Sequence, residues 1–239
     1  MNTDFPGFPG RLIGGATLVA GPVVLCAGYL LRYLSTVTAL TPQQQQWAEA
    51  QPFAAYGQLL GYTAAPALFA LAYAVFTLGA LLMFPAFIAL AQRVGGGLAF
   101  WGATLLAAGL CARLYFAGAD QTAFQLTEVI GLDQATNAIM KEYVDISYGP
   151  WLVPVSASVG QYAGSLLLAI AAWRSGLLGT ARALMLLLAG GTWMGVLKSA
   201  SIPDVLATAL LCVALVPLGV RILGNRQPTP PGRPKALSW

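Results

Sequence analysis

Residues 66–92 read PALFALAYAVFTLGALLMFPAFIALAQ, and this stretch contains no Lys, Arg, Asp or Glu. A helix needs about 20 apolar residues to cross the hydrocarbon core of a bilayer, which is roughly 30 Å thick. The stretch is long enough and apolar enough to meet that requirement. It therefore predicts a membrane-spanning helix.

The rest of the chain shares this apolar character. Of its 239 residues 58% are hydrophobic and only 8% are charged, and the mean hydropathy is +0.72. A soluble domain carries about 25% charged residues because water must solvate its surface. Most of this protein's surface therefore faces something other than water.

Five further apolar stretches lie along the chain, each long enough or nearly long enough to cross a bilayer. They are residues 12–34, 98–119, 151–173, 181–197 and 205–223. We expect an all-α, polytopic transmembrane helix bundle of about six spans, forming a single domain over residues 1–224. Residues 225–239 are rich in Pro and polar side chains, so we expect them to form a disordered cytoplasmic tail.

The charged residues are sorted between the two faces of this bundle. With six spans, the long connections 35–65 and 117–150 lie on one side, and the short turns lie on the other side with both termini. Eight of the twelve cations lie on the terminal side, and seven of the eight acids lie opposite. Lys and Arg mark the cytoplasmic face of a membrane protein. We therefore expect an integral protein of a bacterial plasma membrane, with both termini in the cytoplasm.

The connection 35–65 is expected to carry a short helix on the non-cytoplasmic side. Thr41 followed by Pro42 suits an N-cap with Pro at the first helical position. The helix would lie in the membrane interface, and the alternative is an ordinary polar loop.

Several kinds of chemistry are disfavoured by composition. The chain contains no His, and its three Cys residues form no CxxC motif, which argues against zinc, haem and thiol-pair sites. We therefore expect no metal and no cofactor. The cations are spread thinly between apolar stretches, so they indicate membrane topology and not nucleic-acid binding.

The stretch 113–151 holds five of the eight carboxylates and begins RLYFAGADQTAFQLTE. At helical periodicity Asp120 lies between Phe116 and Phe124 on one face, near the outer edge of the membrane. Desolvation there favours the neutral acid, and an ionisable group at this depth is a functional candidate. The other acids have a plainer alternative as solvated loop residues. The apolar content of 117–150 predicts that this connection packs on the bundle.

Three cations lie at outward ends of the expected spans: Arg32, Arg113 and Lys198. Long cationic side chains at such positions commonly extend to the membrane interface. The alternative is that they turn inward and pair with the acids of this region.

Aromatic residues lie at the same level as these charges. An interfacial belt is one explanation, and a pocket whose ring faces stabilise a cation is the other. The candidate substrate-binding residues are Tyr115, Phe116, Phe124, Tyr143, Tyr148, Trp151, Tyr162 and Trp193.

Carboxylates, aromatic rings and an apolar interior together suit one reaction, the protonation of an alkene or epoxide of a linear prenyl chain followed by carbocation cyclisation. The sequence Leu-Tyr-Phe-Ala-Gly-Ala-Asp120 at a helix end, with acid and aromatic clusters after it, resembles the small bacterial membrane-bound terpene cyclases related to drimentine biosynthesis. That resemblance implies metal-independent cyclisation of a lipophilic, prenylated small molecule, an isomerase or lyase activity in terpenoid biosynthesis. Asp120 would then be the proton donor, with Glu142 and Asp145 as candidates to relay the proton. The alternative function is non-enzymatic: a small-molecule or lipid carrier, or an accessory membrane subunit.

Overall fold

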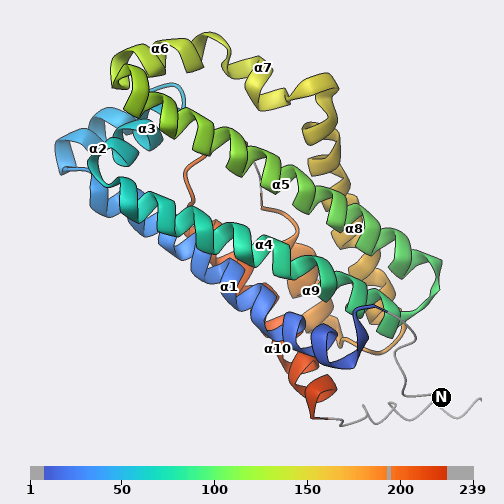
Figure 1. The fold of residues 1–239 in the computed structure, drawn as a ribbon. Coiled ribbons are helices and arrows are strands. Elements are labelled where there is room, and N and C mark those ends of the chain that lie inside the picture. Colours follow the sequence, from blue (N-terminus) through green and yellow to red (C-terminus); the bar gives the residue numbers. More distant parts are fainter. Residues whose placement is uncertain (1–7, 193–194, 225–239) are drawn as a thin grey trace, which may run out of the picture.

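The computed structural model describes residues 8–192 and 195–224, and these form a helical bundle (Figure 1). Five of the helices are long enough and apolar enough to cross a membrane, which confirms the predicted transmembrane bundle. They are α1 (Gly10–Ala39), α4 (Pro66–Val94), α5 (Gly96–Ile130), α8 (Val153–Arg174) and α10 (Ile202–Leu223). The expected tail at 225–239 lies outside the described residues, as does Trp193.

The remaining expected span, 181–197, is not one continuous helix. Helix α9 (Thr180–Ala189) has ten residues, and the described residues that follow it, 190–192 and 195–201, are not helical; we call these residues the 190–201 segment. Ten helical residues rise about 15 Å, roughly half of a bilayer core. The segment continues the crossing from Gly190, beside α8, to Lys198, beside α1. The expected helix end at Leu197 is therefore wrong, although the chain still crosses the bundle there.

The backbone directly after α9 lies very close to α8. A Cβ built on Gly190 would lie 2.2 Å from the Cβ of Ser165 on α8, so only glycine fits. Hydropathy could not reveal this break, because residues 181–197 are apolar enough to form a helix.

The two described ends of the chain lie at the same end of the bundle (Figure 1). Leu223, near the end of α10, packs against Gly15 near the start of α1. The described chain therefore begins and ends at the same end of the bundle, which is consistent with about six crossings.

Short helices cover the opposite end of the bundle: α2 (Pro42–Glu49), α3 (Ala55–Ala64), α6 (Leu132–Lys141), α7 (Tyr143–Tyr148) and the 3-10 helix η1 (Pro150–Leu152). Thr41 caps α2 and forms a capping box with Gln44, which confirms the predicted helix start. Helix α6 buries Ala135 and Ile139 against the bundle. The connection 117–150 is thus helical and packed.

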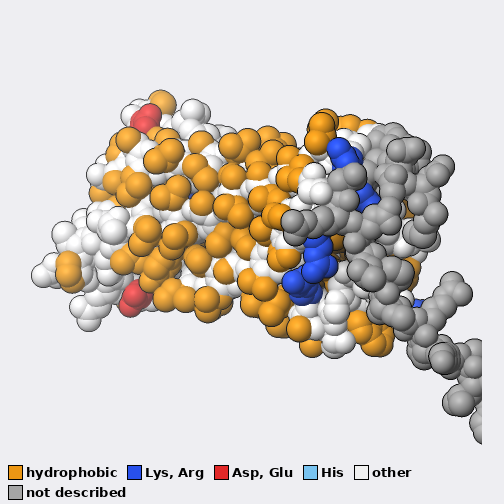
Figure 2. Space-filling view, turned by 90° about the horizontal axis from the view of Figure 1, so that it is seen from below, with side chains coloured by type: hydrophobic (Ala, Val, Ile, Leu, Met, Phe, Trp, Pro, Cys, Tyr) orange, Lys and Arg blue, Asp and Glu red, His pale blue; other side chains and the backbone are white. Residues whose placement is uncertain are grey.

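Hydrophobic side chains form a broad band across the middle of the molecule (Figure 2). On the face shown, the Lys and Arg side chains gather at one end and the Asp and Glu side chains at the other. A band of this kind suits contact with lipid, since exposed apolar surface on this scale is unfavourable in water.

Helices α1 and α4 approach each other most closely at two glycines. A Cβ on Gly28 would lie 2.4 Å from the Cα of Phe76, and one on Gly79 would lie 2.4 Å from the backbone nitrogen of Leu25. Small residues let transmembrane helices pack backbone against backbone in this way.

Gly28→Ala is therefore expected to destabilise the protein by about 1–3 kcal/mol, since the added methyl group meets backbone that cannot turn away. Thermal unfolding in a non-ionic detergent measures the loss. Gly118→Ala is the matched control, because nothing lies within 4 Å of a Cβ at that helical position. Equal stability of the two variants would contradict the close α1–α4 contact.

Candidate functional site

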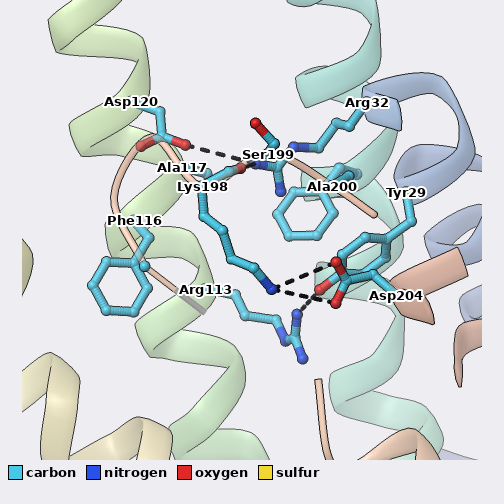
Figure 3. A pocket seen from close by; sticks show the side chains of 12 residues that line it. Tyr29, Arg32, Arg113, Phe116, Ala117, Asp120, Lys198, Ser199, Ala200 and Asp204 are labelled. Atoms are coloured by element: carbon cyan, nitrogen blue, oxygen red, sulfur yellow. Dashed lines mark hydrogen bonds and ion pairs between the residues drawn. The ribbon is translucent and has the colours of Figure 1, made fainter. Parts of the chain in front are cut away.

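Asp120 lies on α5 and is 1% exposed. The hydroxyl of Tyr73 donates a hydrogen bond to its Oδ2 at 2.7 Å, and the backbone N–H of Leu197 donates to its Oδ1. The Nη2 atom of Arg32 lies 3.8 Å from Oδ2. Figure 3 shows Asp120 and Arg32 facing each other at the edge of one cavity. The predicted burial of Asp120 is confirmed, and the carboxyl has three polar neighbours.

Arg32 turns inward from α1. Its Nη2 donates to the Tyr73 hydroxyl at 3.0 Å and to the Lys198 carbonyl at 2.9 Å. The guanidinium carbon lies 4.4 Å from the ring centroid of Tyr73 and 4.8 Å from that of Phe76. The Nε atom is buried and has no hydrogen-bond partner. Arg32 therefore does not extend to the membrane interface. The alternative prediction, that it turns inward and pairs with an acid, is confirmed by its contact with Asp120.

Lys198 also pairs with an acid. Its Nζ lies 3.4 Å from Oδ1 of Asp204, which is 5% exposed at the start of α10. Asp204 in turn accepts hydrogen bonds from the backbone nitrogen and the hydroxyl of Ser201, at 2.9 and 2.6 Å, and so caps α10. Figure 3 shows the lysine side chain running along the cavity toward this carboxylate.

Arg113 differs from the other two cations because its hydrogen-bond partners are neutral. Its Nε donates to Oε1 of Gln161 at 3.2 Å, Nη2 donates to Oγ1 of Thr192 at 2.6 Å, and Nη1 donates to the Tyr29 hydroxyl. The side chain is 5% exposed. Among the described residues no carboxylate lies within 4 Å of this guanidinium.

The backbone of the 190–201 segment is held by buried side chains from several helices. Gln161 of α8 donates to the Gly190 carbonyl, and Tyr143 of α7 donates to the Val196 carbonyl. Asp120 and Arg32 bind the next two residues along the segment. Leu197, whose N–H binds Asp120, has a φ of 51°, a left-handed conformation that is unfavourable for leucine. The buried polar residues of several helices therefore converge on one non-helical stretch.

One cavity joins these charges, and we call it the charged cavity. Its volume is about 20 Å³, which is room for an ordered water. It is lined by Tyr29, Arg32, Phe76, Arg113, Phe116, Ala117, Asp120, Gly195, Lys198, Ser199, Ala200 and Asp204.

A larger cavity of about 550 Å³, which we call the outer vestibule, opens between α1, α2, α3 and the start of α10. Ser199 and Ala200 line both cavities, so this short stretch of the 190–201 segment forms the wall between them. Gln58 of α3 donates to the Ser199 hydroxyl at 3.0 Å and to Thr36 at 2.9 Å, which fastens that wall to α1 and α3.

Four of the predicted aromatic residues lie around Asp120 and the segment. Phe116 lines the charged cavity. Phe124 packs edge-on against Tyr73, with ring centroids 5.3 Å apart. The Tyr143 hydroxyl binds Val196, and Tyr115 packs against Phe116 with centroids 5.4 Å apart.

Other predicted site residues lie elsewhere. Glu142 and Asp145 are exposed beside α7, and neither lines the charged cavity. Tyr148 is also exposed. Tyr162 is half-buried on α8, close enough to Arg113 to interact with it electrostatically. The side chain of Trp151, like the whole of Trp193, falls outside what the structure describes.

Glu128 is more than a solvated loop residue. It accepts a hydrogen bond from the hydroxyl of Tyr62 on α3, and this bond raises the pKa of Tyr62 to about 12. The Tyr62 ring stacks on Phe124 at a centroid distance of 4.5 Å. The pair therefore anchors α3 to the outer end of α5.

Sequence reasoning missed Tyr29, Tyr73, Thr192 and Gln58 as parts of this site. Tyr73 has the clearest sequence feature, a lone phenol in the middle of the uncharged stretch 66–92. Gln58 and Thr192 carry no local pattern that sets them apart from other polar residues near helix ends. Only the fold brings them to the 190–201 segment.

Comparison of the chain with protein-family models, with curated proteins and with solved structures finds no match. In the described part of the chain, no group of three or more Cys, Asp or Glu side chains is placed to hold a metal ion.

The Arg32–Asp120 pair yields a prediction about stability. Arg32→Met should cost about 3–5 kcal/mol, because it leaves a buried carboxylate without its cation. The double variant Arg32→Met/Asp120→Asn should lose less, because it removes both charges. Unfolding in detergent of the two single variants and the double variant measures the coupling, and simply additive losses would contradict the pairing.

Proposed function

We propose that the protein is a membrane-bound enzyme that cyclises a lipophilic prenyl chain by acid catalysis, with Asp120 as the proton donor. The observation that carries the proposal is that Asp120, almost fully buried, lines one cavity together with the aromatic rings of Phe116, Phe76 and Tyr29. An acid beside ring faces is the arrangement that alkene protonation and carbocation stabilisation require.

The surroundings of Asp120 suit both states of a proton donor. Burial disfavours charge before the reaction, so the neutral acid is available. Once the proton has left, the Tyr73 hydroxyl, the Leu197 N–H and the Arg32 cation stabilise the carboxylate. A donor to an alkene needs this help, because an alkene is a very weak base.

The reaction we propose balances without a cofactor. Asp120 transfers its proton to one carbon of an alkene, and the neighbouring carbon becomes a cation. A second alkene of the same chain attacks that cation with its π electrons and closes a ring. Loss of a proton from a carbon beside the final cation completes the product, and the exposed acids Glu142 and Asp145 are candidates to return a proton to Asp120.

The aromatic faces near Asp120 already stabilise one cation, the guanidinium of Arg32 over Tyr73 and Phe76. Energies of such contacts reach about 2 kcal/mol in a desolvated setting. The ring of Phe116, which lines the same cavity, could stabilise a carbocation in the same way once the substrate chain lies beside it.

Access to Asp120 would run through the outer vestibule. The charged cavity itself holds about 20 Å³, whereas the vestibule behind Ser199 and Ala200 holds about 550 Å³. The dividing stretch is not helical, so moving it aside breaks no helical ladder. A lipophilic chain could therefore pass from the bilayer through the vestibule to the acid.

We propose in addition that both termini are cytoplasmic in a bacterial plasma membrane. The support is the gathering of Lys and Arg at the end of the bundle where the chain begins and ends (Figure 2). The vestibule and Asp120 then belong to the half of the membrane that faces away from the cytoplasm.

Cysteine labelling tests this orientation. In a cysteine-free background, Ala50→Cys and Ala138→Cys are exposed and should react with an impermeant maleimide on intact cells. Ser175→Cys, exposed in the turn between α8 and α9, should react only after permeabilisation. Labelling of all three from one face would exclude the topology.

A second candidate function is that of a small-molecule carrier, and the discontinuous crossing favours it. Binding sites of many transporters lie where a helix is interrupted near the middle of the membrane. Here α9 ends at Ala189, and its continuation lines the charged cavity. A carrier would bind and move its ligand unchanged, whereas a cyclase would convert it.

Asp120→Asn separates the two candidates. Purified protein is incubated with a panel of linear farnesyl-type compounds without added metal, and the products are identified by mass spectrometry. Asp120→Asn should lower turnover by at least 10²–10⁴-fold, the usual value of a general acid, while still binding substrate. Tyr115→Ala should retain activity and release more hydroxylated product, because water reaches the cation sooner.

Asp133→Asn is the matched control, since it removes an exposed acid at the same end of the molecule that has no part in the proposed mechanism. A fully active Asp120→Asn protein would remove Asp120 from the mechanism. Transport of an unchanged compound by wild-type protein in vesicles, with no product formed, would favour the carrier.

A further inference from the structure

We propose that Arg113 and Arg32 hold the anionic group of a small monoanion, most simply a monocarboxylate, inside the outer half of the bundle. This site goes beyond the proposed cyclisation. It depends chiefly on Arg113, a charge that alkene protonation does not use, and it shares Arg32 with the proposed acid site.

Arg113 is the first reason. It is a permanent cation within the longest of the membrane-crossing helices and is 95% buried, yet its hydrogen-bond partners are an amide and two hydroxyls. A buried charge is costly unless an opposite charge compensates it. Three of its five N–H groups are used by those partners, which leaves donors for a ligand.

Arg32 is the second reason. It is 91% buried, it lines the same cavity, and its Nε has no partner. A buried donor that makes no hydrogen bond destabilises the folded protein. Its single close carboxylate oxygen, on Asp120, lies 3.8 Å away, which is longer than a charge-assisted hydrogen bond. A ligand oxygen in the cavity could satisfy this donor.

The charge balance indicates how much negative charge the site takes. Three cations line the charged cavity, Arg32, Arg113 and Lys198, against the two carboxylates of Asp120 and Asp204. With all five ionised, three minus two leaves a formal charge of +1, and when Asp120 carries its proton the excess is +2, so the lining is positive in both states. With Asp120 ionised, one negative charge makes the lining neutral, whereas a dianion would leave an uncompensated charge of the opposite sign.

The surroundings of Arg113 indicate the rest of the ligand. Arg113 also lines a second cavity of about 30 Å³ on its other side, whose walls are mostly apolar and include Leu106, Leu110, Leu186 and Leu211. The ligand would place its anionic group at the arginines and its apolar part among these leucines. A planar carboxylate suits the guanidinium fork, which binds it through two parallel hydrogen bonds.

The test uses the full-length protein in a non-ionic detergent, with hexanoate and dodecanoate as probes. Hexanol and dodecanol are the uncharged controls. Thermal unfolding is followed as each compound is titrated, and a dissociation constant is obtained from the shift in Tm. Hexanoate is water-soluble and represents a ligand that enters from water. Dodecanoate partitions into lipid and represents a ligand that enters from the bilayer.

We expect at least one carboxylate to raise Tm where its alcohol does not. Arg113→Gln should weaken that binding by about ten- to hundredfold, as expected when a hydrogen-bonded charge is lost. Without ligand its Tm should equal or exceed that of wild type, because an uncompensated buried charge is gone. Arg113→Lys, which keeps the charge but lacks the fork, should weaken binding less.

Arg174→Gln, at an exposed arginine on α8, is the matched control and should respond like wild type. Equal shifts with acids and alcohols, or unchanged carboxylate binding by both Arg113 variants, would overturn the proposal. The readout is binding and not turnover. Failure of the cyclase assay therefore leaves this result intact, and failure here leaves the role of Asp120 open to its own test.

Discussion

Backbone at membrane depth must find hydrogen-bond partners inside the protein. The 190–201 segment cannot supply its own, because its described residues are not helical. An unsatisfied peptide group in hydrocarbon costs several kcal/mol, so non-helical backbone survives there only when protein surrounds it or a cavity hydrates it. Side chains of the surrounding helices bind the described backbone of this segment at four points. Gln161, Tyr143, Asp120 and Arg32, from four different helices, bind successive parts of it.

That constraint explains why the polar residues of the bundle lie where they do. Tyr73 bridges Arg32 and Asp120, and both of these hold the segment, so α1, α4 and α5 meet it through one hydrogen-bonded group. Loss of any member leaves another one buried without its partner. The geometry of the candidate site and the stability of the fold are therefore properties of the same few side chains.

Holding the backbone does not account for everything in this region. A continuous helix over 181–201 would have satisfied its own backbone and needed none of these buried charges. Leu197 instead adopts a strained conformation, Arg32 keeps a donor without a partner, and Arg113 adds a cation that no described carboxylate compensates. Strain and uncompensated charge persist at functional sites because function requires them. Both the acid chemistry proposed for Asp120 and the anion site proposed at Arg113 would use such features.

The sequence by itself determined the class of protein and the approximate positions of five membrane-crossing helices. Uncharged apolar stretches such as 66–92 can lower their free energy only by entering lipid or a buried core, and the sorted charges specify which ends meet water. Local chemistry was also sufficient at Thr41, where the cap and the following proline depend on neighbours three residues away. The helical phase placed Phe116, Asp120 and Phe124 on one buried face.

Only the tertiary structure decided where the fifth crossing stops being helical and which charge meets which partner. Residues 181–197 have the hydropathy of a span, so hydropathy does not mark the end of the helix at Ala189, and the close contact of Gly190 with Ser165 of another helix is visible only in the fold. Arg32 and Arg113 look alike along the sequence, each a lone cation at the outer end of an apolar stretch. Their different surroundings arise from contacts with residues 41 and 48 or more positions away, which no local pattern encodes.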